Sequence, residues 1–175
     1  MSPSAAKVDE LLRNARQSAV HLEMRDGYMR DDPAFHAWNT GYRVDKSDRQ
    51  SWWRPWLDVV AEAVNCGVVI RRARIVSEPV SDYIRYEYDV TFPNISAGEQ
   101  IRWLPRRNAS DLALPGNDFW VFDDRVMLWT HFTGEGEISP EGWEVTEDLA
   151  QVKVCAAAFE SAWDRAVPHG DYRPA

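Results

Sequence analysis

The sequence predicts an α/β protein in which helices flank a single mixed β-sheet. The β-branched run VVIRRARIV at 68–76 follows directly on a helical segment, and α/β sheets are built from such joints. Apolar residues alternate through 118–132 around Asp123 and Asp124, which predicts a β-hairpin. An amphipathic pattern over 146–167 predicts a helix after that hairpin.

The length and charge of the chain limit the domain organisation and the kinds of partner that can be expected. A chain of 175 residues suits a single domain, 1–175, with a mainly helical part at 1–66, a sheet core at 67–132, an acidic loop at 133–145 and a C-terminal helix at 146–167. The net charge of -8 opposes contact with a phosphate backbone, so no direct nucleic-acid partner is expected. The chain shows no signal-peptide pattern and no apolar run long enough for a membrane span, so we expect a cytoplasmic protein with no membrane partner.

Four elements are expected in the N-terminal part. Apolar residues at helical spacing predict a helix near 8–15. Residues 20–24 alternate apolar and polar side chains, which favours a short strand, although the same letters also fit a continued helix. A proline at the first helical position and a closing glycine predict a brief helix over 33–41. Ser51 as N-cap predicts a longer helix that continues to Asn65.

The middle of the chain is predicted to continue as strand, helix and strand. Pro79 at the first helical position and a shared apolar face predict a helix over 80–90, whereas the alternation within it also fits a second strand. Residues 93–98 are predicted to form a loop, and the run IRWLP at 101–105 is only long enough for a strand. Residues 108–117 are predicted to be a surface connection of the length at which functional loops occur.

Both faces of the predicted hairpin at 118–132 are largely apolar, which indicates a strand pair inside a sheet that is covered on both sides. Asp123 and Asp124 tolerate the positive φ that a two-residue turn requires. Two adjacent carboxylates also suit acid/base chemistry, but turn chemistry explains the pair without a reaction. Glycine, proline and acidic residues predict that 133–145 is exposed, and Pro168 is expected to end the last helix.

No residue set in the sequence completes a known catalytic or metal-binding constellation. A G-x-S-x-G elbow and a phosphate-binding glycine cluster are both absent, and the four histidines lack zinc-ligand spacing. We therefore expect no catalytic residue, no metal and no cofactor, and a protein that is not an enzyme. Cys66 and Cys155 lie far apart in apolar contexts, which predicts two buried free thiols.

Arginines gather in and beside the predicted strands, and a buried guanidinium group needs a partner. One interpretation pairs these arginines with nearby acids such as Glu78, Glu87 or Asp123 at an edge of the sheet. The other interpretation groups them around an anionic small molecule or an acidic partner, because planar guanidinium forks fit carboxylate and phosphate. The candidate binding residues are Arg71, Arg72, Arg74, Tyr83, Arg85, Arg102, Trp103 and Arg106.

Four blocks of the sequence resemble an uncharacterised family of actinobacterial proteins that is known mainly as a domain of unknown function. The blocks are VIRRARIVSEPVSDYIRYEY, IRWLPRR, LPGNDFWVFDDRVMLWTHF and AFESAWDRAVPHGDYRP. The resemblance extends over nearly the whole chain and is weak only at 43–51. Because this sequence resembles genes encoded beside helix-turn-helix regulators in filamentous actinobacteria, the resemblance implies a regulatory or partner role.

A second resemblance concerns the fold. The strand of the form GVxIRxxxV, the short strand that ends in Leu-Pro and the hairpin with Asp-Asp at its turn look like half of a phospholipase D-type α/β module, in which the active residues form H-x-K-x4-D. The corresponding positions here hold Asn117 and Phe119 before Asp124, or Gly116 and Asp118 before Asp123. Only the aspartate remains, so phosphodiester chemistry by that route is not expected to run.

Together these observations predict a non-catalytic binding protein, an accessory partner in a transcriptional-regulatory pair of an actinobacterium, with a helix-turn-helix regulator as its protein partner. The alternative is a sensor of a small anionic molecule or a degenerate phosphodiesterase-like enzyme that uses the arginine and tyrosine cluster. The predicted architecture is a phospholipase D-like half-module with an N-terminal helical extension.

Overall fold

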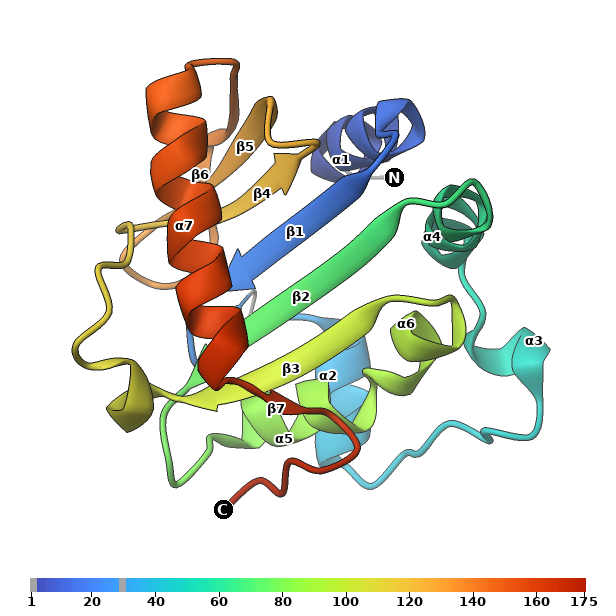
Figure 1. Cartoon of the computed structure of the whole chain (residues 1–175). Helices are drawn as coiled ribbons and strands as arrows, with labels where there is room; N and C mark the ends of the chain where they lie inside the picture. The colour runs from blue at the N-terminus through green and yellow to red at the C-terminus, as the bar shows by residue number, and fades with distance from the viewer. Residues whose placement is uncertain (1–2, 29–30) are drawn as a thin grey trace.

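The computed structural model of the chain describes residues 3–28 and 31–175 (Figure 1). These residues form a seven-stranded mixed sheet with the order β6-β5-β4-β1-β2-β3-β7. The central strands β1, β2 and β3 run parallel, and the remaining neighbours pair antiparallel. The strands are β1 (Ser18–Glu23), β2 (Val69–Val76), β3 (Gln100–Pro105), β4 (Asp118–Phe122), β5 (Val126–Phe132), β6 (Ile138–Thr146) and β7 (Val167–Pro168).

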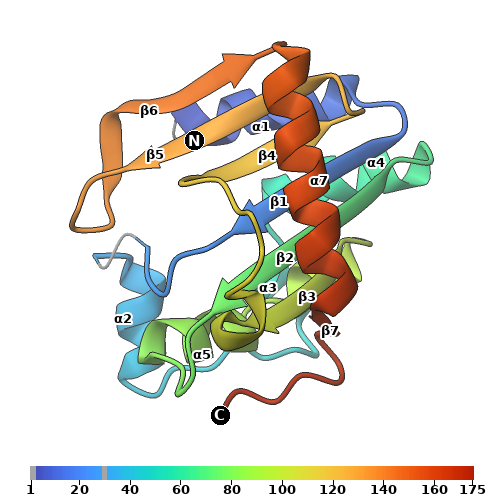
Figure 2. The same ribbon diagram turned by 60° about the vertical axis from the view of Figure 1, so that its left-hand side comes forward.

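Helices cover both faces of this sheet, as the sequence predicts. The long helix α7 crosses one face, and α1, α4 and α5 lie on the other face (Figures 1 and 2). The helices of the described chain are α1 (Pro3–Asn14), α2 (Pro33–Asn39), α3 (Arg49–Trp52), α4 (Pro55–Asn65), α5 (Asp82–Asp89), α6 (Phe92–Ser96), the 3-10 helix η1 (Arg106–Ala109) and α7 (Leu149–Arg165). The fold is therefore the α/β class with one mixed sheet flanked by helices.

Apolar side chains fill the space on each side of the sheet. Leu22, Phe119 and Met127 pack against Phe159 and other residues of α7. The opposite face carries a second core, in which residues of α1 and α4 cover strands β1, β2, β4 and β5. A smaller third cluster packs α5 against β3 and the C-terminal segment. This division leaves the middle of the second face, between α1, α4 and α5, for the polar residues described below.

The helix predicted from Ser51 to Asn65 is two helices, so its predicted N-cap is wrong. Ser51 lies inside α3, and α4 begins at Pro55 with Arg54 as its N-cap residue. Arg54 is extended, at φ -126° and ψ 155°, because the ring of a following proline disfavours helical geometry in the preceding residue. The proline is therefore the first residue of a new helix, not part of a continuing one.

Residues 133–145 do not form a loop throughout, which corrects the prediction for this segment. Strand β6 begins at Ile138 and pairs antiparallel with β5 as the edge of the sheet. Pro140 fits there because an edge strand leaves half of its N–H groups unpaired. The loop predicted at 93–98 likewise contains α6, and helix α7 ends at Arg165, before the short strand β7 that includes Pro168.

The other predicted elements are confirmed with small changes in their bounds. The strand predicted at 20–24 is β1, which spans 18–23, and α5 begins at Asp82, with Ser81 as a side-chain N-cap, in place of the predicted start after Pro79. The hairpin turns at Asp123 and Asp124, whose φ angles are 51° and 50°. No helix within the described residues is long and apolar enough to cross a lipid bilayer.

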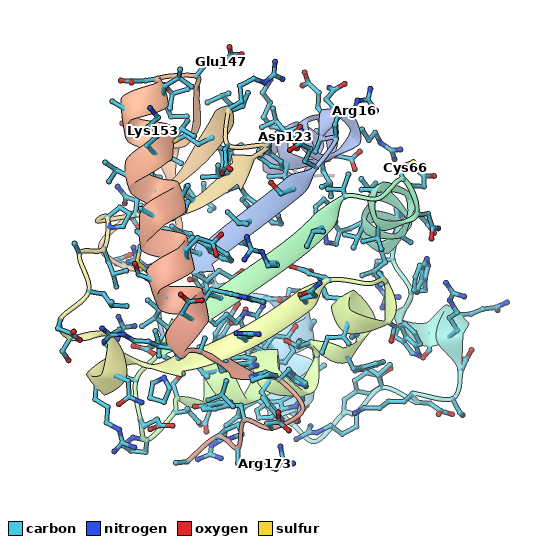
Figure 3. All side chains as sticks on the ribbon, in the orientation of Figure 1. Arg16, Cys66, Asp123, Glu147, Lys153 and Arg173 are labelled. Atoms are coloured by element: carbon cyan, nitrogen blue, oxygen red, sulfur yellow. The ribbon has the colours of Figure 1, made fainter. Side chains whose placement is uncertain are left out.

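The carboxylate of Asp123 also joins the hairpin to the start of β1. It accepts hydrogen bonds from the backbone N–H groups of Arg16, Gln17 and Ser18 at 2.7–2.9 Å, and Figure 3 shows Asp123 beside Arg16. Burial opposes ionisation of this carboxyl, but the three N–H donors outweigh it and lower its pKa. The structural interpretation of the aspartate turn is therefore confirmed.

Candidate ligand-binding site

A cavity of about 520 Å³ opens over the middle of the sheet face opposite α7. We call it the sheet cavity. Its floor comes from strands β1, β2, β4 and β5, and its walls come from α1, α4, α5 and β6. Aromatic side chains line much of it, namely Tyr28, Trp56, Tyr83, Trp120, Phe132 and Trp143. The polar lining consists of His21, Glu23, Arg72, Glu87, Asp118 and Thr130.

Strand register explains why these side chains share one face. His21 pairs with Arg72 on one neighbouring strand and with Trp120 on the other. Asp118 pairs with Thr130 on the next strand along. Directly opposite residues in a sheet point to the same side, and alternate residues of one strand do so too. Polar positions that lie far apart in the sequence therefore meet at the cavity floor.

An ion-pair network lies in this floor. Arg72 donates from Nη1 to Glu23 Oε1 and from Nε to Glu99 Oε1, both at 2.7 Å. Arg74 donates to the other oxygen of Glu23 and, from Nη1, to the hydroxyl of Thr91 at 2.7 Å. Burial opposes the charge of Glu23, but Arg74 and Arg72 outweigh it and hold the pKa of this carboxyl well below its usual range. Glu23 therefore stays ionised between the two guanidinium groups.

Two other carboxyls of the cavity have raised pKa values. Burial raises the pKa of Glu87 to about 7, since Arg74 lowers it only in part and Glu23 raises it further. Burial likewise raises the pKa of Asp118 to about 6, although two hydrogen bonds act to lower it. These come from Tyr28 Oη at 2.5 Å and from the N–H of Met24 at 2.9 Å. Both carboxyls therefore exchange protons close to neutral pH.

Two buried polar atoms of the cavity lack a hydrogen-bond partner among the described residues. They are Nδ1 of His21 and Oε2 of Glu87. Nδ1 lies 3.4 Å from Glu23 Oε1 without forming a hydrogen bond, and Glu87 Oε1 lies 3.6 Å from Nη2 of Arg74. Burial lowers the pKa of His21 to about 3, so its ring is neutral and stacks on Trp120 with centroids 4.2 Å apart. An unmade hydrogen bond to a buried polar group costs about 1–3 kcal/mol.

The structure brings three of the eight candidate binding residues to this site. Arg72 and Tyr83 line the sheet cavity, and Arg74 lies in the network beneath it. Trp103 is fully buried behind Arg74, whose guanidinium carbon is 5.0 Å from the indole centroid. Arg85 is exposed on α5.

The remaining arginines lie elsewhere. Arg71 and Arg102 point to the other face of the sheet because they alternate with their neighbours along the strand. There Arg71 pairs with Glu160 of α7 at 2.6 Å, and Arg102 donates to the carbonyl of Trp163 at 3.0 Å. Arg106 lies just past the end of β3 and pairs with Asp26 at 3.2 Å. The arginines that lie close together in the sequence are thus divided between the two faces of the sheet, the end of β3 and the surface of α5.

Sequence reasoning missed most of the acidic half of the site. Asp118 begins an otherwise apolar strand, and Glu23 ends a strand in which Ser18 and His21 are the other polar residues. A charged residue at an inward position of a strand is the signal that could have identified both. Within the described residues, no group of three or more His, Cys, Asp or Glu side chains could hold a metal ion. The phospholipase-type positions do not form a site either, because Asn117 and Asp124 lie beyond opposite ends of β4.

The sheet and its flanking helices define an α/β protein of the phospholipase D-like fold. A crystal structure of a phospholipase D family member, Nuc from Salmonella typhimurium, aligns with a TM-score of 0.51 and 11% identity over 98% of this chain and 94% of that one. The structure of TrmBL2, an archaeal chromatin protein, aligns with a TM-score of 0.49 and 13% identity over 93% of this chain and 49% of that one.

The chain belongs to the family described as Domain of unknown function (DUF6879), whose model matches residues 6–174. No curated protein matches the sequence.

Proposed function

We propose that this chain is a binding protein whose sheet cavity holds a small organic molecule, and that it acts through occupancy of the cavity. The observation that carries the proposal is a cavity of about 520 Å³ whose lining includes two buried atoms, one each from His21 and Glu87, that have no hydrogen-bond partner among the described residues. Small-molecule sites have volumes of roughly 300–1,000 Å³, with apolar and aromatic walls and a few polar groups. A ligand that bonds to these two atoms recovers hydrogen bonds that the described chain leaves unmade.

Binding fits the site better than phosphodiester chemistry does. Phosphoryl transfer needs cationic donors that are free to hold the transferred group. Arg72 and Arg74 already donate to Glu23, Glu99 and Thr91. The raised pKa values of the cavity carboxyls follow from burial beside a fixed ion-pair network, which a binding protein also provides.

A thermal-shift screen tests this proposal directly. A ligand at 100 times its Kd stabilises the folded state by about 2.7 kcal/mol, which raises the Tm of a chain of this size by roughly 5–11 °C. Trp120, Trp56 and Trp143 line the cavity, so a true ligand also changes the tryptophan emission. No shift in Tm or emission with any compound of a broad metabolite set contradicts the proposal.

Two matched variants test whether an observed ligand binds in the sheet cavity. Ile138→Trp fills the rim of the cavity, whereas Val154→Trp adds the same indole to an exposed position of α7 on the opposite face. We expect the first variant to lose ligand binding and the second to keep it. Equal binding by both variants would put the ligand elsewhere.

A second candidate function, a protein-binding role in a regulatory pair, is favoured by a separate groove of about 520 Å³ between α2 and α6. We call it the aromatic groove. Its lining includes Trp38, Trp52, Trp56, Tyr86 and Phe92. Three basic side chains, Arg43, Lys46 and Arg54, accompany a single acidic one, Asp89, in a chain whose net charge is -8. Aromatic residues and arginine are enriched in protein interfaces, so the groove suits an acidic partner surface.

The partner expected from the sequence resemblance is a helix-turn-helix regulator. Pull-down from a native lysate with the wild-type chain and with the double variant Arg43→Glu, Lys46→Glu tests this candidate. We expect the wild type to recover such a regulator at low salt, and the charge-reversed variant to lose it. Recovery of the regulator by both proteins, or by neither, contradicts docking in the aromatic groove.

A further inference from the structure

The sheet cavity contains more buried carboxylates than cations. Four carboxyls line the cavity or lie directly beneath it, those of Glu23, Glu87, Glu99 and Asp118. Among the residues that the structure describes, two guanidinium groups pair with these carboxyls, those of Arg72 and Arg74. Arg25 also lowers the pKa of Asp118, but its guanidinium donates to the carbonyl of Thr133 and lies over the ring of Phe132, 4.8 Å from the centroid. Full ionisation of the carboxyls therefore leaves the site negative.

Two of the four carboxyls, those of Glu87 and Asp118, lack a direct hydrogen bond from a guanidinium group among the described residues. Glu23 and Glu99 hold the hydrogen bonds of the guanidinium groups, as described above. Glu87 comes no closer than 3.6 Å to Arg74, and its Oε2 has no partner among the described residues. Within the described part of the chain, the hydrogen bonds to Asp118 come from neutral donors, a tyrosine hydroxyl and a backbone N–H. Because an unneutralised buried carboxylate is costly, both side chains favour a cation close to them.

The walls of the cavity also suit a cation. Tyr83, Trp120 and Trp143 belong to its aromatic lining, and an aromatic ring attracts positive charge because its face is the negative side of its quadrupole. The same rings accommodate an apolar ligand body. An anion would meet Glu23, Glu87 and Asp118 with the available guanidinium groups already engaged.

We infer that the ligand of the sheet cavity is an organic cation, an amine or guanidine carried on an aromatic or aliphatic body, whose charged end lies at Glu87 and Asp118. The inference rests on the proposed function, because it names the class of molecule that the cavity takes. It also reverses the charge of the ligand expected from the arginine content of the sequence.

A cationic ligand binds best when Glu87 is ionised. Burial raises the pKa of this carboxyl, and it faces Arg72 and Arg74 together with two acids, Glu23 and Asp118. A bound cation favours the ionised form, so complex formation at neutral pH releases protons from Glu87 and Asp118. The affinity for an amine that stays protonated in this range should therefore rise several-fold between pH 6 and pH 8.

Isothermal titration calorimetry with compounds that are matched in shape and differ in charge tests the inference. The set is 2-phenylethylamine, 2-phenylethanol and phenylacetate, which share a ring and differ in charge, together with the indole series tryptamine, tryptophol and indole-3-acetate. We expect the amine of each series to bind at least tenfold more tightly than its alcohol, and the carboxylate to bind most weakly. The amine is expected to bind more tightly at pH 8 than at pH 6, with proton release.

Glu87→Gln removes the unpaired charge and keeps the shape of the side chain. It should weaken amine binding about tenfold and leave alcohol binding unchanged, whereas the exposed Glu147→Gln, seen at the start of α7 in Figure 3, should change neither. If Glu87→Gln does not fold, the affinity order of the wild type within each series still decides the question.

The two proposals fail in different ways. If alcohols or carboxylates bind as tightly as amines and Ile138→Trp abolishes that binding, the cavity is a ligand site and the cation assignment is wrong. If no member of either series binds, or if Ile138→Trp has no effect, both proposals are contradicted for these ligands.

Discussion

The imidazole of His21 stacks on the indole of Trp120, with ring centroids 4.2 Å apart and planes 17° from parallel. Burial lowers the pKa of His21 to about 3, with Arg72 and Arg74 adding to the effect and Glu23 opposing it. A group whose pKa is depressed by folding stabilises the folded state above its unfolded pKa, and this contribution is lost as pH falls from about 6.5 toward 3. We expect the nitrogen-15 shifts of His21 to stay constant from pH 8 to pH 5, and a titration midpoint near 6.5 would contradict its burial.

Arg72 should be among the most costly single side chains to remove. Its side chain is 11% exposed and joins Glu23 to Glu99. Arg72→Met leaves two buried carboxylates short of a partner, which should lower the free energy of unfolding by about 3–5 kcal/mol. Urea unfolding followed by tryptophan emission measures the loss. The matched control is Arg165→Met, since the pair of Arg165 with Asp111 is exposed and its loss should leave the urea midpoint nearly unchanged.

Glu87 should make the protein less stable as pH rises through neutrality. Its pKa is about 7 in the folded state, above the ordinary value of 4.5, mainly because of burial. The folded state therefore binds the proton more tightly, and the stability from the neutral carboxyl is present below about pH 4.5 and lost as pH rises through 7. At about 1.4 kcal/mol for each unit, the loss is on the order of 3 kcal/mol.

Glu87→Gln should remove most of the stability loss that Glu87 causes as pH rises through neutrality. Asp118, whose pKa is raised to about 6, gives a smaller slope of the same sign in both proteins, so the difference between wild type and variant isolates Glu87. The measurement is urea unfolding at pH 5 and pH 8. Parallel pH profiles for the two proteins would show that Glu87 ionises freely.

Asp123 and Asp124 should differ in their importance, although both adopt positive φ. Asn tolerates this conformation as well as Asp, so the same substitution at both sites leaves the turn itself intact. Asp123→Asn removes an acceptor from the N–H groups of 16–18 and should cost about 1–2 kcal/mol. Asp124→Asn should change the Tm by less than the error of differential scanning calorimetry. Equal effects would mean that the turn, not the capping contact, carries the stability.

The two cysteines should react at very different rates with Ellman's reagent. Cys155 is buried against the sheet, and burial raises the pKa of its thiol to about 11, whereas Cys66 is exposed at the end of α4. Since the thiolate is the reactive form, we expect one fast thiol in the folded chain and two in denaturant. The sequence context predicted that both were buried, and Cys66 corrects that prediction. Two fast thiols in the folded chain would contradict the packing of α7.

Features that depend on neighbouring residues could be predicted from the sequence. The alternation in 118–132, the N1 proline of α2 and the positive-φ tolerance of the aspartate turn follow from local sterics and periodicity. Strand β6 could not be predicted in the same way, because Pro140, Glu141 and Gly142, which disfavour a strand, interrupt its strand-forming residues. It is a strand because β5 offers an unpaired edge, and that pairing belongs to the sheet as a whole.

The sequence by itself determined the α/β class, most of the helices and strands, and the fact that buried arginines need partners. Only the tertiary structure decided which partners they have. Arg72 meets Glu23 across 49 positions of sequence because β1 and β2 are neighbours in one register, and a shift of one residue would move either side chain to the α7 face. Strand order and register are long-range pairings. Because of these pairings, the site that the sequence predicted to be rich in arginine is a cavity with more carboxyl groups than guanidinium groups among the described residues.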